Sequence, residues 1–313
     1  MEDSLGSTVD RDWAEAMRGT DLQRAWSICD RNLQEYCRSG AAKHTGERHL
    51  QRIWRGEPLV DQRVLVRCYH GLGDTIQFVR FAEPLREIAR EVLVWAQPEL
   101  LELLRGVEGI DSLHPLHDGT PEFAYDVDIE IMELAHALRV TPGAIAGRVP
   151  YLHVGQSFRP SPAHSKPASP VSVGLVWEAG NWDRRRCMPP RLLKRLNSIP
   201  GIRLYSLQQG GRAMADAIPA EDIAAPDLQS LAATIMSLDL VLTIDTMVAH
   251  LAGALGAPVW TTLHADCDWR WPKAARRSMW YPTMTLFHQP SSGDWEGLVE
   301  QVATELNQFV LPA

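Results

Sequence analysis

The sequence predicts an α/β protein of two domains, each built on a parallel β-sheet with helices on its faces. The length of 313 residues exceeds what one hydrophobic core usually accommodates. Short apolar runs alternate with amphipathic helical stretches, the pattern of βαβ units, and the alternation begins anew near residue 171. Between the two series lies a segment rich in proline and serine at 157–170, which predicts an interdomain linker. We therefore expect two Rossmann-like domains that face a central cleft.

The expected boundaries follow these changes in texture. They are a helical N-terminal extension at 1–53, a first Rossmann-like domain at 54–160 and a second at 161–313. Within the extension, residues 12–38 are rich in helix formers and are interrupted at Gly19-Thr20, which predicts one or two amphipathic helices. These helices either pack on the first domain or form a dimer contact.

Apolar runs bounded by turn residues predict the strands, and longer amphipathic stretches predict the helices. The expected strands are 63–68, 91–96, 125–132, 171–177, 202–208, 239–245, 258–264 and 283–289. The expected helices are 75–90, 98–104, a segment from about 189, 228–238, 247–256 and 294–310. Proline at 98 suits a first helical turn, and Gly256 followed by Pro258 closes the helix that begins at 247.

Composition narrows the class of protein. The chain is 45% hydrophobic and 22% charged, as ordinary soluble proteins are, and its net charge of −8 argues against a nucleic-acid binder that relies on bulk electrostatics. The N-terminus is acidic and polar, unlike a secretory signal, and no apolar stretch approaches the roughly 20 residues of a membrane span. The five cysteines are scattered, which is typical of reduced thiols. We expect a cytoplasmic protein.

The first motif, H-G-L-G-D-T-I-Q, occupies 70–77 between a strand and a helix. Its two glycines permit a tight turn, and a helix N-terminus can hold an anion. A dinucleotide fingerprint would need a third glycine where this chain has Ile76, so NAD binding is not expected. Asp74 is either a base that removes a proton from an acceptor hydroxyl or a cap of the helix.

The second motif, L-T-I-D-T-M-V-A-H-L-A-G-A-L-G, occupies 242–256. Asp245 and Thr246 end a strand, and the amides of Thr246, Met247 and Val248 would point out of the new helix toward a diphosphate. His250 either reaches the same ligand, donates to Asp245, or is a buried histidine that ties the strand to the helix.

Two further motifs follow strand ends. V-W-E-A-G-N-W-D-R-R-R at 176–186 ends in three arginines, which either bind phosphate oxygens or form a solvated surface. H-A-D-C-D-W-R-W at 264–271 contains His264, Asp266 and Asp268, but their spacing matches no familiar metal loop. Trp269 and Trp271 pack in the core, or one of them borders a nucleotide base.

Together these motifs resemble glycosyltransferase family nine, the ADP-heptose–lipopolysaccharide heptosyltransferases and their relatives. The nearest branch looks like the heptosyltransferase-like domains that follow tetratricopeptide repeats. The resemblance covers about 260 residues. It is carried by W-R-G-E-P-L (54–59), G-L-G-D-T-I-Q-F-V-R-F (71–81), V-G-L-V-W-E-A-G-N-W-D-R-R-R (173–186), S-L-Q-Q-G (206–210), S-L-D-L-V-L-T-I-D-T-M-V-A-H-L-A-G-A-L-G-A-P-V-W (237–260), D-W-R-W (268–271) and W-Y-P-T-M-T-L-F-H-Q (280–289).

The resemblance implies a GT-B fold whose last helix crosses back to the first domain, and an inverting, metal-independent transfer that needs no cofactor. It implies that Asp74 is the catalytic base, that Arg186 contacts the donor diphosphate, and that Gln208 ends the strand whose loop borders the nucleoside. The donor-binding residues that we expect are Gly73, Thr75, Gln77, Asn181, Gln208, Asp245, Thr246, Met247, Val248 and His250.

The expected function is transfer of a sugar, with heptose one candidate, from a nucleotide-diphosphate donor to a hydroxyl acceptor on a glycan, a lipid-linked glycan or a protein. Two alternatives remain. One is a non-catalytic nucleotide-sugar-binding or scaffold protein, and the other is a sugar-nucleotide epimerase of the same fold. A homo-oligomer through the N-terminal helices is a further expectation, and no metal site is expected.

Overall fold

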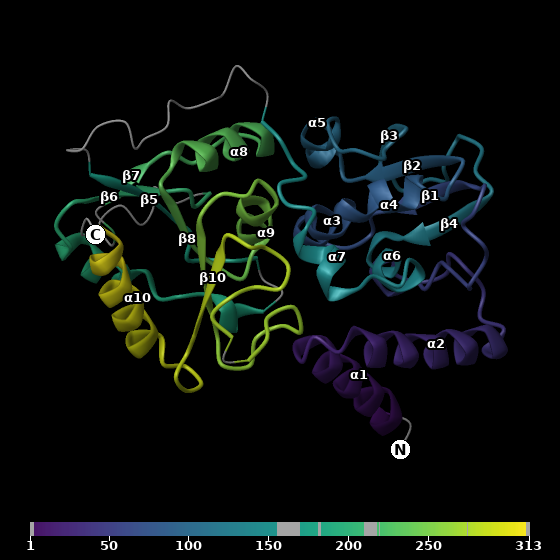
Figure 1. Cartoon of the computed structure of the whole chain (residues 1–313), viewed down its shortest axis with the longest axis horizontal. Coiled ribbons are helices and arrows are strands. Elements are labelled where there is room, and N and C mark those ends of the chain that lie inside the picture. The colour runs from purple at the N-terminus through teal and green to yellow at the C-terminus, as the bar shows by residue number, and fades with distance from the viewer. Residues whose placement is uncertain are drawn as a thin grey trace. The chain divides into compact units, whose positions relative to one another are not determined.

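The computed structural model describes residues 3–154, 170–180, 183–209, 218, 220–273 and 275–310. The chain divides into two compact units, Met1–His153 and Val154–Ala313 (Figure 1). The boundary lies beside the linker predicted at 157–170, most of which is outside the described residues. Each unit contains one parallel β-sheet, as the two series of apolar runs predict.

The first unit has a four-stranded parallel sheet in the order β3-β2-β1-β4. Its strands are β1 (Arg63–Arg67), β2 (Glu91–Ala96), β3 (Ser112–Pro115) and β4 (Val127–Glu130). In register, Val64 of β1 faces Val92 of β2 on one side and Val127 of β4 on the other. The sequence did not predict β3, because its residues S-L-H-P alternate weakly and end in proline. Proline is tolerated there because β3 is an edge strand.

The helix predicted at 75–90 is wrong in its start and in its continuity. It begins three residues earlier and is divided into α3 (Leu72–Phe78), a 3₁₀ turn (Val79–Phe81) and α4 (Ala82–Arg86). Pro84 explains the division, since it has no N–H to donate to the carbonyl of Arg80. The other helical segments of this unit are Arg48–Leu50, Pro98–Leu100, α5 (Leu101–Leu104), Ile131–Glu133, α6 (Leu134–Ala137) and α7 (Pro142–Ala146).

The N-terminal helices α1 (Asp3–Arg18) and α2 (Leu22–Ser39) pack within the first unit. The break falls at Gly19-Thr20 as predicted, and Asp21 caps α2 by accepting the amide of Arg24 at 3.0 Å. The buried indole of Trp26 donates to the carbonyl of Val140 at 2.9 Å. These contacts show that α2 is part of the fold of the first unit.

The second unit has a six-stranded parallel sheet in the order β10-β9-β8-β5-β6-β7. Its strands are β5 (Val171–Leu175), β6 (Ile202–Ser206), β7 (Glu221–Asp222), β8 (Leu240–Ile244), β9 (Val259–Leu263) and β10 (Met284–His288). Numbered within the unit, this is the doubly wound order 3-2-1-4-5-6. The direction of winding reverses between β5 and β8, and such a switch point is where open parallel sheets bind ligands.

The helical segments of the second unit are Arg184–Arg186, Pro190–Ser198, α8 (Leu228–Ser237), α9 (Met247–Ala254) and α10 (Trp295–Val310). The segment predicted to be helical from about 189 is a 3₁₀ helix. The last helix, α10, buries Leu298, Val302 and Leu306 in the core of this unit. Its path back to the first domain stays a prediction.

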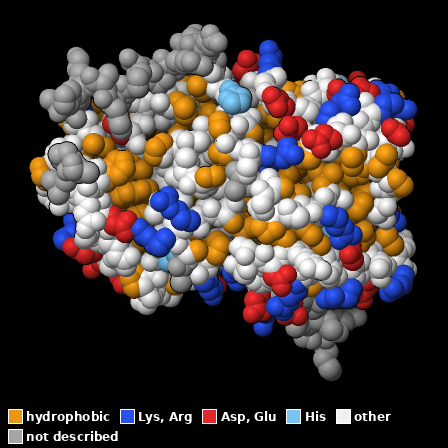
Figure 2. Space-filling view, in the orientation of Figure 1, with side chains coloured by type: hydrophobic (Ala, Val, Ile, Leu, Met, Phe, Trp, Pro, Cys, Tyr) orange, Lys and Arg blue, Asp and Glu red, His pale blue; other side chains and the backbone are white. Residues whose placement is uncertain are grey.

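Charge on the surface is dispersed. On the face drawn in Figure 2, acidic and basic side chains are interspersed among polar and apolar ones, so no basic stripe dominates this face. None of the helices described is long and apolar enough to cross a membrane.

One glycine in the second unit allows a close approach that any larger residue would prevent. A Cβ atom at Gly253 of α9 would overlap the ring of Tyr281. We predict that Gly253→Ala lowers the free energy of unfolding by about 1–3 kcal/mol, although alanine favours the helix. Gly143 of α7 is the matched control, because nothing lies within 4 Å of a Cβ added there. Equal melting temperatures for Gly253→Ala and Gly143→Ala would contradict this packing.

Candidate functional site

Several of the predicted donor residues of the second unit lie at the switch point of its sheet. The loop after β5 contains residues 176–186, and the turn after β8 is formed by Asp245 and Thr246. Val176 donates its amide to the carbonyl of Leu242 at 3.0 Å, which extends the pairing of β5 with β8 to the start of the loop. Both loops therefore leave the sheet from neighbouring strand ends.

Helix α9 starts beside this point. Thr246 is its N-cap, and its hydroxyl oxygen accepts the amide of Val248 at 3.1 Å. The predicted free amide of Val248 is therefore already engaged. The amides of Thr246 and Met247 make no hydrogen bond to any described residue, so they are the ones that remain for an anionic ligand.

The three consecutive arginines have different partners. Arg184 pairs with Glu178 at 2.8 Å, and Arg185 pairs with Asp183 at 2.8 Å. Arg186 instead donates through Nη1 to the carbonyl oxygen of Asp245 at 3.1 Å and through Nε to the carbonyl oxygen of Asp183 at 3.3 Å. Two of the charges are thus paired with carboxylates, whereas that of Arg186 is held by neutral oxygens beside the start of α9.

The carboxyl group of Asp245 is buried beneath this arginine. Burial, reinforced by the charge of Asp268, raises the pKa of Asp245 from 3.8 to about 6, while the guanidinium groups of Arg270 and Arg186 oppose the rise. The hydrogen bond of Arg186 to the carbonyl oxygen of Asp245 places the two residues together, and their binding of a donor stays a prediction.

His250 lies behind Asp245 in an aromatic cluster. Its Nδ1 is 2.9 Å from the hydroxyl of Tyr281, and its ring stacks on Trp271 with centroids 5.5 Å apart. Gly253, one turn further along α9, lets the ring of Tyr281 approach. The side chain is buried, which favours the buried-histidine interpretation over direct ligand contact. Contact of His250 with a donor stays a prediction.

The side-chain oxygen of Gln208 is used inside the protein. It accepts the amide of Trp177 at 3.2 Å and that of Glu178 at 2.9 Å, and so ties the end of β6 to the loop after β5. Its predicted place beside the nucleoside is untested. Asn181, also predicted to bind the donor, lies outside the described residues.

The residues of 264–271 that could have been metal ligands have other partners. Asp268 accepts from Arg270 at 2.8 Å, Asp266 lies 3.4 Å from Arg185, and His264 lies 3.8 Å from Asp183. Across the described residues, no group of three histidine, cysteine or acidic side chains is arranged to hold a metal ion.

The sequence analysis did not predict that a buried arginine and the tryptophans it contacts pack close to this site. Arg270 is buried and stacks on Trp269, with its guanidinium carbon 4.2 Å from the ring centroid. Its carbonyl accepts the indole of Trp280 at 3.1 Å. The density of aromatic residues around D-W-R-W was the available signal, but it does not reveal which strand end they support.

In the first unit, Asp74 caps the start of α3, which is one of the two roles that the sequence predicted for it. Gly71 is the N-cap of α3, and its amide donates to the Asp74 carboxylate at 2.9 Å while the Asp74 amide donates to the Gly71 carbonyl at 3.0 Å. The cap leaves open whether Asp74 also acts as a base, because a carboxylate has several acceptor positions.

The other predicted residues near Asp74 differ in accessibility. Gly73 is in the first turn of α3 and half-buried. The side chains of Thr75 and Gln77 are fully buried. Thr75 donates to the amide oxygen of Gln97 at 3.0 Å, and Gln97 donates to the carbonyl of His70 at 2.7 Å. Thr75 therefore fixes the loop before α3 rather than presenting its hydroxyl to solvent.

Two buried acids at the end of β4 were also missed. Burial raises the pKa of Glu130 well above its ordinary value and that of Glu133 to about 7. Glu130 ends β4 opposite Arg67, the last residue of β1. The alternating acids of Y-D-V-D-I-E at 125–130 were the signal, but alternation alone suggests that they face solvent.

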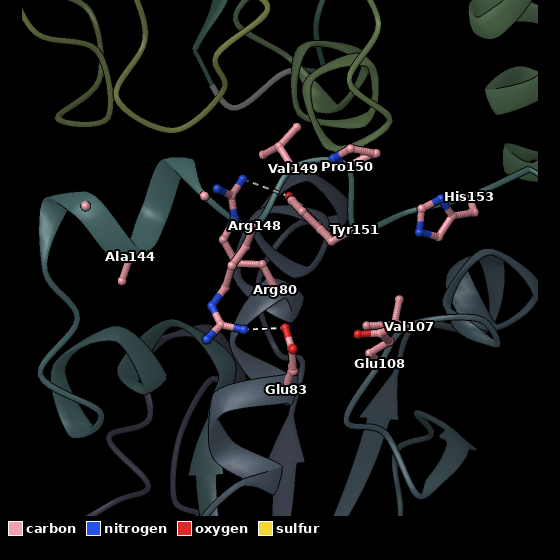
Figure 3. A pocket seen from close by; sticks show the side chains of 12 residues that line it. Arg80, Glu83, Val107, Glu108, Ala144, Arg148, Val149, Pro150, Tyr151 and His153 are labelled. Carbon is pink, nitrogen blue, oxygen red and sulfur yellow. Dashed lines mark hydrogen bonds and ion pairs between the residues drawn. The ribbon is translucent and has the colours of Figure 1, made fainter.

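A separate cavity of about 470 Å³ in the first unit contains none of the predicted residues (Figure 3). Arg80 donates to the hydroxyl of Tyr151 at 2.9 Å, and Arg148 forms an ion pair with Glu83. The ion pair of Arg148 with Glu83 and the hydrogen bond of Arg80 to Tyr151 therefore hold residues 148–151 against the helical segments at 79–86.

No family model matches the chain. It is 25% identical over 305 residues to Protein FlbA of Caulobacter vibrioides, a match that covers 82% of this chain and 48% of the relative. The chain thus spans about half the length of that relative.

Solved structures show the fold. A family 9 glycosyl transferase from Veillonella parvula superposes with a TM-score of 0.55 at 13% identity, covering 82% of this chain and 99% of that one. Escherichia coli ADP-heptose LPS heptosyltransferase II gives 0.57 at 13%, covering 79% and 98%. The glycosyltransferase TibC of enterotoxigenic E. coli gives 0.54 at 14%, covering 81% and 78%. The fold is that of family nine glycosyltransferases, as the resemblance implied. The tetratricopeptide-associated branch stays a prediction.

The raised pKa of Asp245 predicts a pH dependence of stability. Between about pH 4 and 6 the folded protein holds a proton on Asp245 that the unfolded chain has lost. Protonation of Asp245 therefore contributes fully to the free energy of unfolding below pH 4, and the contribution is lost as pH rises through 6. Asp245→Asn removes the titration. The difference in unfolding free energy, variant minus wild type, should rise by about 1 kcal/mol between pH 5 and 7.5. Urea denaturation at both pH values measures it, and a pH-independent difference would contradict the assignment.

Proposed function

We propose that this chain is an inverting glycosyltransferase that binds a nucleotide-diphosphate sugar at the switch point of its second unit. The observation that carries the proposal is the position of Arg186, whose guanidinium is held by the carbonyl oxygens of Asp183 and Asp245 beside the first turn of α9. A guanidinium next to a helix N-terminus stabilises the negative charge of a leaving diphosphate. The fold shared with family nine glycosyltransferases supports the same reading.

The proposed transfer involves one base and one leaving group. Asp74 takes the proton of an acceptor hydroxyl as the hydroxyl oxygen attacks the anomeric carbon of the sugar. The bond between that carbon and the diphosphate oxygen breaks, and the nucleoside diphosphate leaves with the electron pair. Arg186 and the amides of Thr246 and Met247 stabilise the negative charge of the leaving nucleoside diphosphate, and no metal ion takes part in the proposed transfer.

The first donor to test is ADP-heptose. One structural neighbour, TibC, is described in complex with ADP-D-β-D-heptose, and it superposes with a TM-score of 0.51. Another is named for ADP-heptose. We further propose a cytoplasmic location, where nucleotide sugars are made, and an acceptor with a free hydroxyl group.

If Arg186 and α9 bind the diphosphate, ADP should stabilise the protein far more than adenosine does. At about 100 times the dissociation constant, binding adds roughly 2.7 kcal/mol to the unfolding free energy. Arg186→Ala should weaken ADP binding at least tenfold, because charge-assisted hydrogen bonds are lost. Arg184→Ala is the matched control, since Arg184 is already paired with Glu178, and it should change binding by less than about twofold. Thermal shift and calorimetry measure the affinities for ADP and for adenosine. An equal response to the two ligands would show that the diphosphate does not bind at Arg186 and α9.

The substitution Asp74→Asn separates the two roles of Asp74. The asparagine oxygen still accepts the amide of Gly71, so the helix cap and the melting temperature should be kept. The base is lost, so turnover should fall by about 10²-fold or more while donor affinity is unchanged. A variant with near-normal turnover would show that Asp74 only caps the helix. Donor binding by a wild-type protein that never transfers sugar would favour the non-catalytic alternative.

A further inference from the structure

A closed ring of hydrogen bonds surrounds the loop that precedes Asp74, and the transfer step above uses no other member of it. The hydroxyl of Thr75 donates to the side-chain oxygen of Gln97 at 3.0 Å, and the side-chain nitrogen of Gln97 donates to the carbonyl oxygen of His70 at 2.7 Å. The amide of Gly71 donates to the carboxylate of Asp74 at 2.9 Å. Because Asp74 and Thr75 are consecutive residues of α3, these bonds close the ring.

Two sides of a single peptide group belong to this ring. The carbonyl oxygen of His70 and the amide hydrogen of Gly71 are part of the same planar unit, and the bond between the two residues is trans. The oxygen and the hydrogen therefore point in opposite directions, the first toward Gln97 and the second toward Asp74. A rotation of this unit that breaks the bond to Gln97 also turns the amide of Gly71 away from the carboxylate.

Gln97 is itself held in place by the sheet. It directly follows β2, which pairs with β1, and the bond from the amide of Cys68 to the carbonyl of Trp95 at 3.1 Å extends this pairing beyond β1. The next residue, Pro98, favours extended backbone at Gln97, whose φ of −52° and ψ of 134° agree with that restriction. The side chain of Gln97 therefore fixes the loop after β1 relative to the end of β2.

The bond to the carbonyl of His70 also strengthens the bond to Asp74. A hydrogen bond accepted by a carbonyl polarises the peptide group and makes its N–H a better donor, and an ionised carboxylate is a strong acceptor. The amide of Gly71 uses Oδ2 of Asp74. It thereby sets the direction in which the carboxylate presents its other acceptor positions.

We propose that Gln97 is a positioning residue for Asp74. Through the peptide group of His70 and Gly71, it fixes the orientation in which the carboxylate meets the acceptor hydroxyl. The inference rests on the proposed function and adds to it a residue that lies outside the sequence motifs. Because Gln97 acts through Asp74, its loss should lower the rate of transfer and leave the affinity for the donor unchanged.

The first test observes the ring without requiring activity. The sequence contains a single histidine–glycine pair, His70-Gly71, so full-length protein labelled with ¹³C-carbonyl histidine and ¹⁵N-glycine gives one HNCO peak. Its carbon shift reports the bond to Gln97, and its proton shift reports the bond to Asp74. We expect Gln97→Leu to move both shifts, the proton upfield because its bond weakens, and Asp74→Ala to move the proton furthest. Thr75→Val should give part of this change, and Thr75→Ser, which keeps the hydroxyl, should restore the wild-type peak.

Kinetics test the effect on transfer. Gln97→Leu should lower kcat about tenfold and leave the KM for the donor within about twofold of the wild type. Gln51→Leu is the matched control, because the side chain of Gln51 also donates to a main-chain carbonyl of the first unit, that of Gly46 at 2.8 Å, outside the ring. Its kcat should stay within about twofold of the wild type. In the Asp74→Asn background, Gln97→Leu should lower kcat by less than about a further twofold, because its effect passes through the lost carboxylate.

Each result decides one part of the proposal. A peak that Gln97→Leu leaves unchanged overturns the link between Gln97 and Asp74. A kcat of Gln97→Leu equal to that of the wild type, or equal falls in the wild-type and Asp74→Asn backgrounds, overturns the positioning role. Melting curves confirm folding, and Gln97→Met, which has a similar volume, replaces Gln97→Leu if that variant does not fold. Absence of any transfer by the wild type overturns the proposed function, while the NMR peak still decides whether Gln97 orients Asp74.

Discussion

The hydrogen bond from Arg186 to the carbonyl oxygen of Asp245 joins the two loops on which the candidate donor site depends. Each loop leaves the sheet at a strand next to the switch point, and the winding of the chain brings the ends of β5 and β8 together although about 70 residues separate them in sequence. The bond fixes a positive charge beside the start of α9. The buried carboxyl of Asp245 and the aromatic cluster around His250 support the same turn from behind.

Much of the fold could be predicted because both sheets are parallel and buried, so their strands read as apolar runs with helices between them. The strands that were not predicted lack this long, buried, apolar pattern. Strand β3 is a short edge strand, and β7 has two exposed residues, Glu221 and Asp222. The split of the helix after β1 depends on one missing amide, that of Pro84, whose effect on a helix varies with its tertiary contacts.

The sequence predicted which strand ends carry the residues of the candidate site, but not which side chains contact one another there. Spacing alone placed all three arginines at one strand end. Only the tertiary structure distinguishes Arg186 from Arg184, because Arg184 pairs with Glu178 in the same loop, while Arg186 also reaches a carbonyl in the turn after β8. Glu130 was missed for a related reason. Its burial follows from the register of β4 beside β1, which the alternating sequence does not encode.

Because main-chain oxygens hold Arg186, its position does not depend on which side chains its hydrogen-bond partners carry. Its two hydrogen bonds end on carbonyl groups of residues 183 and 245, and every amino acid supplies a carbonyl. Substitutions at these anchors can change local charge without deleting the acceptor atoms, provided that the backbone keeps its path. The arginine can therefore stay in place when the side chains around it are substituted. In this arrangement the path of the main chain, and not the identity of the side chains at 183 and 245, sets the position of the guanidinium group.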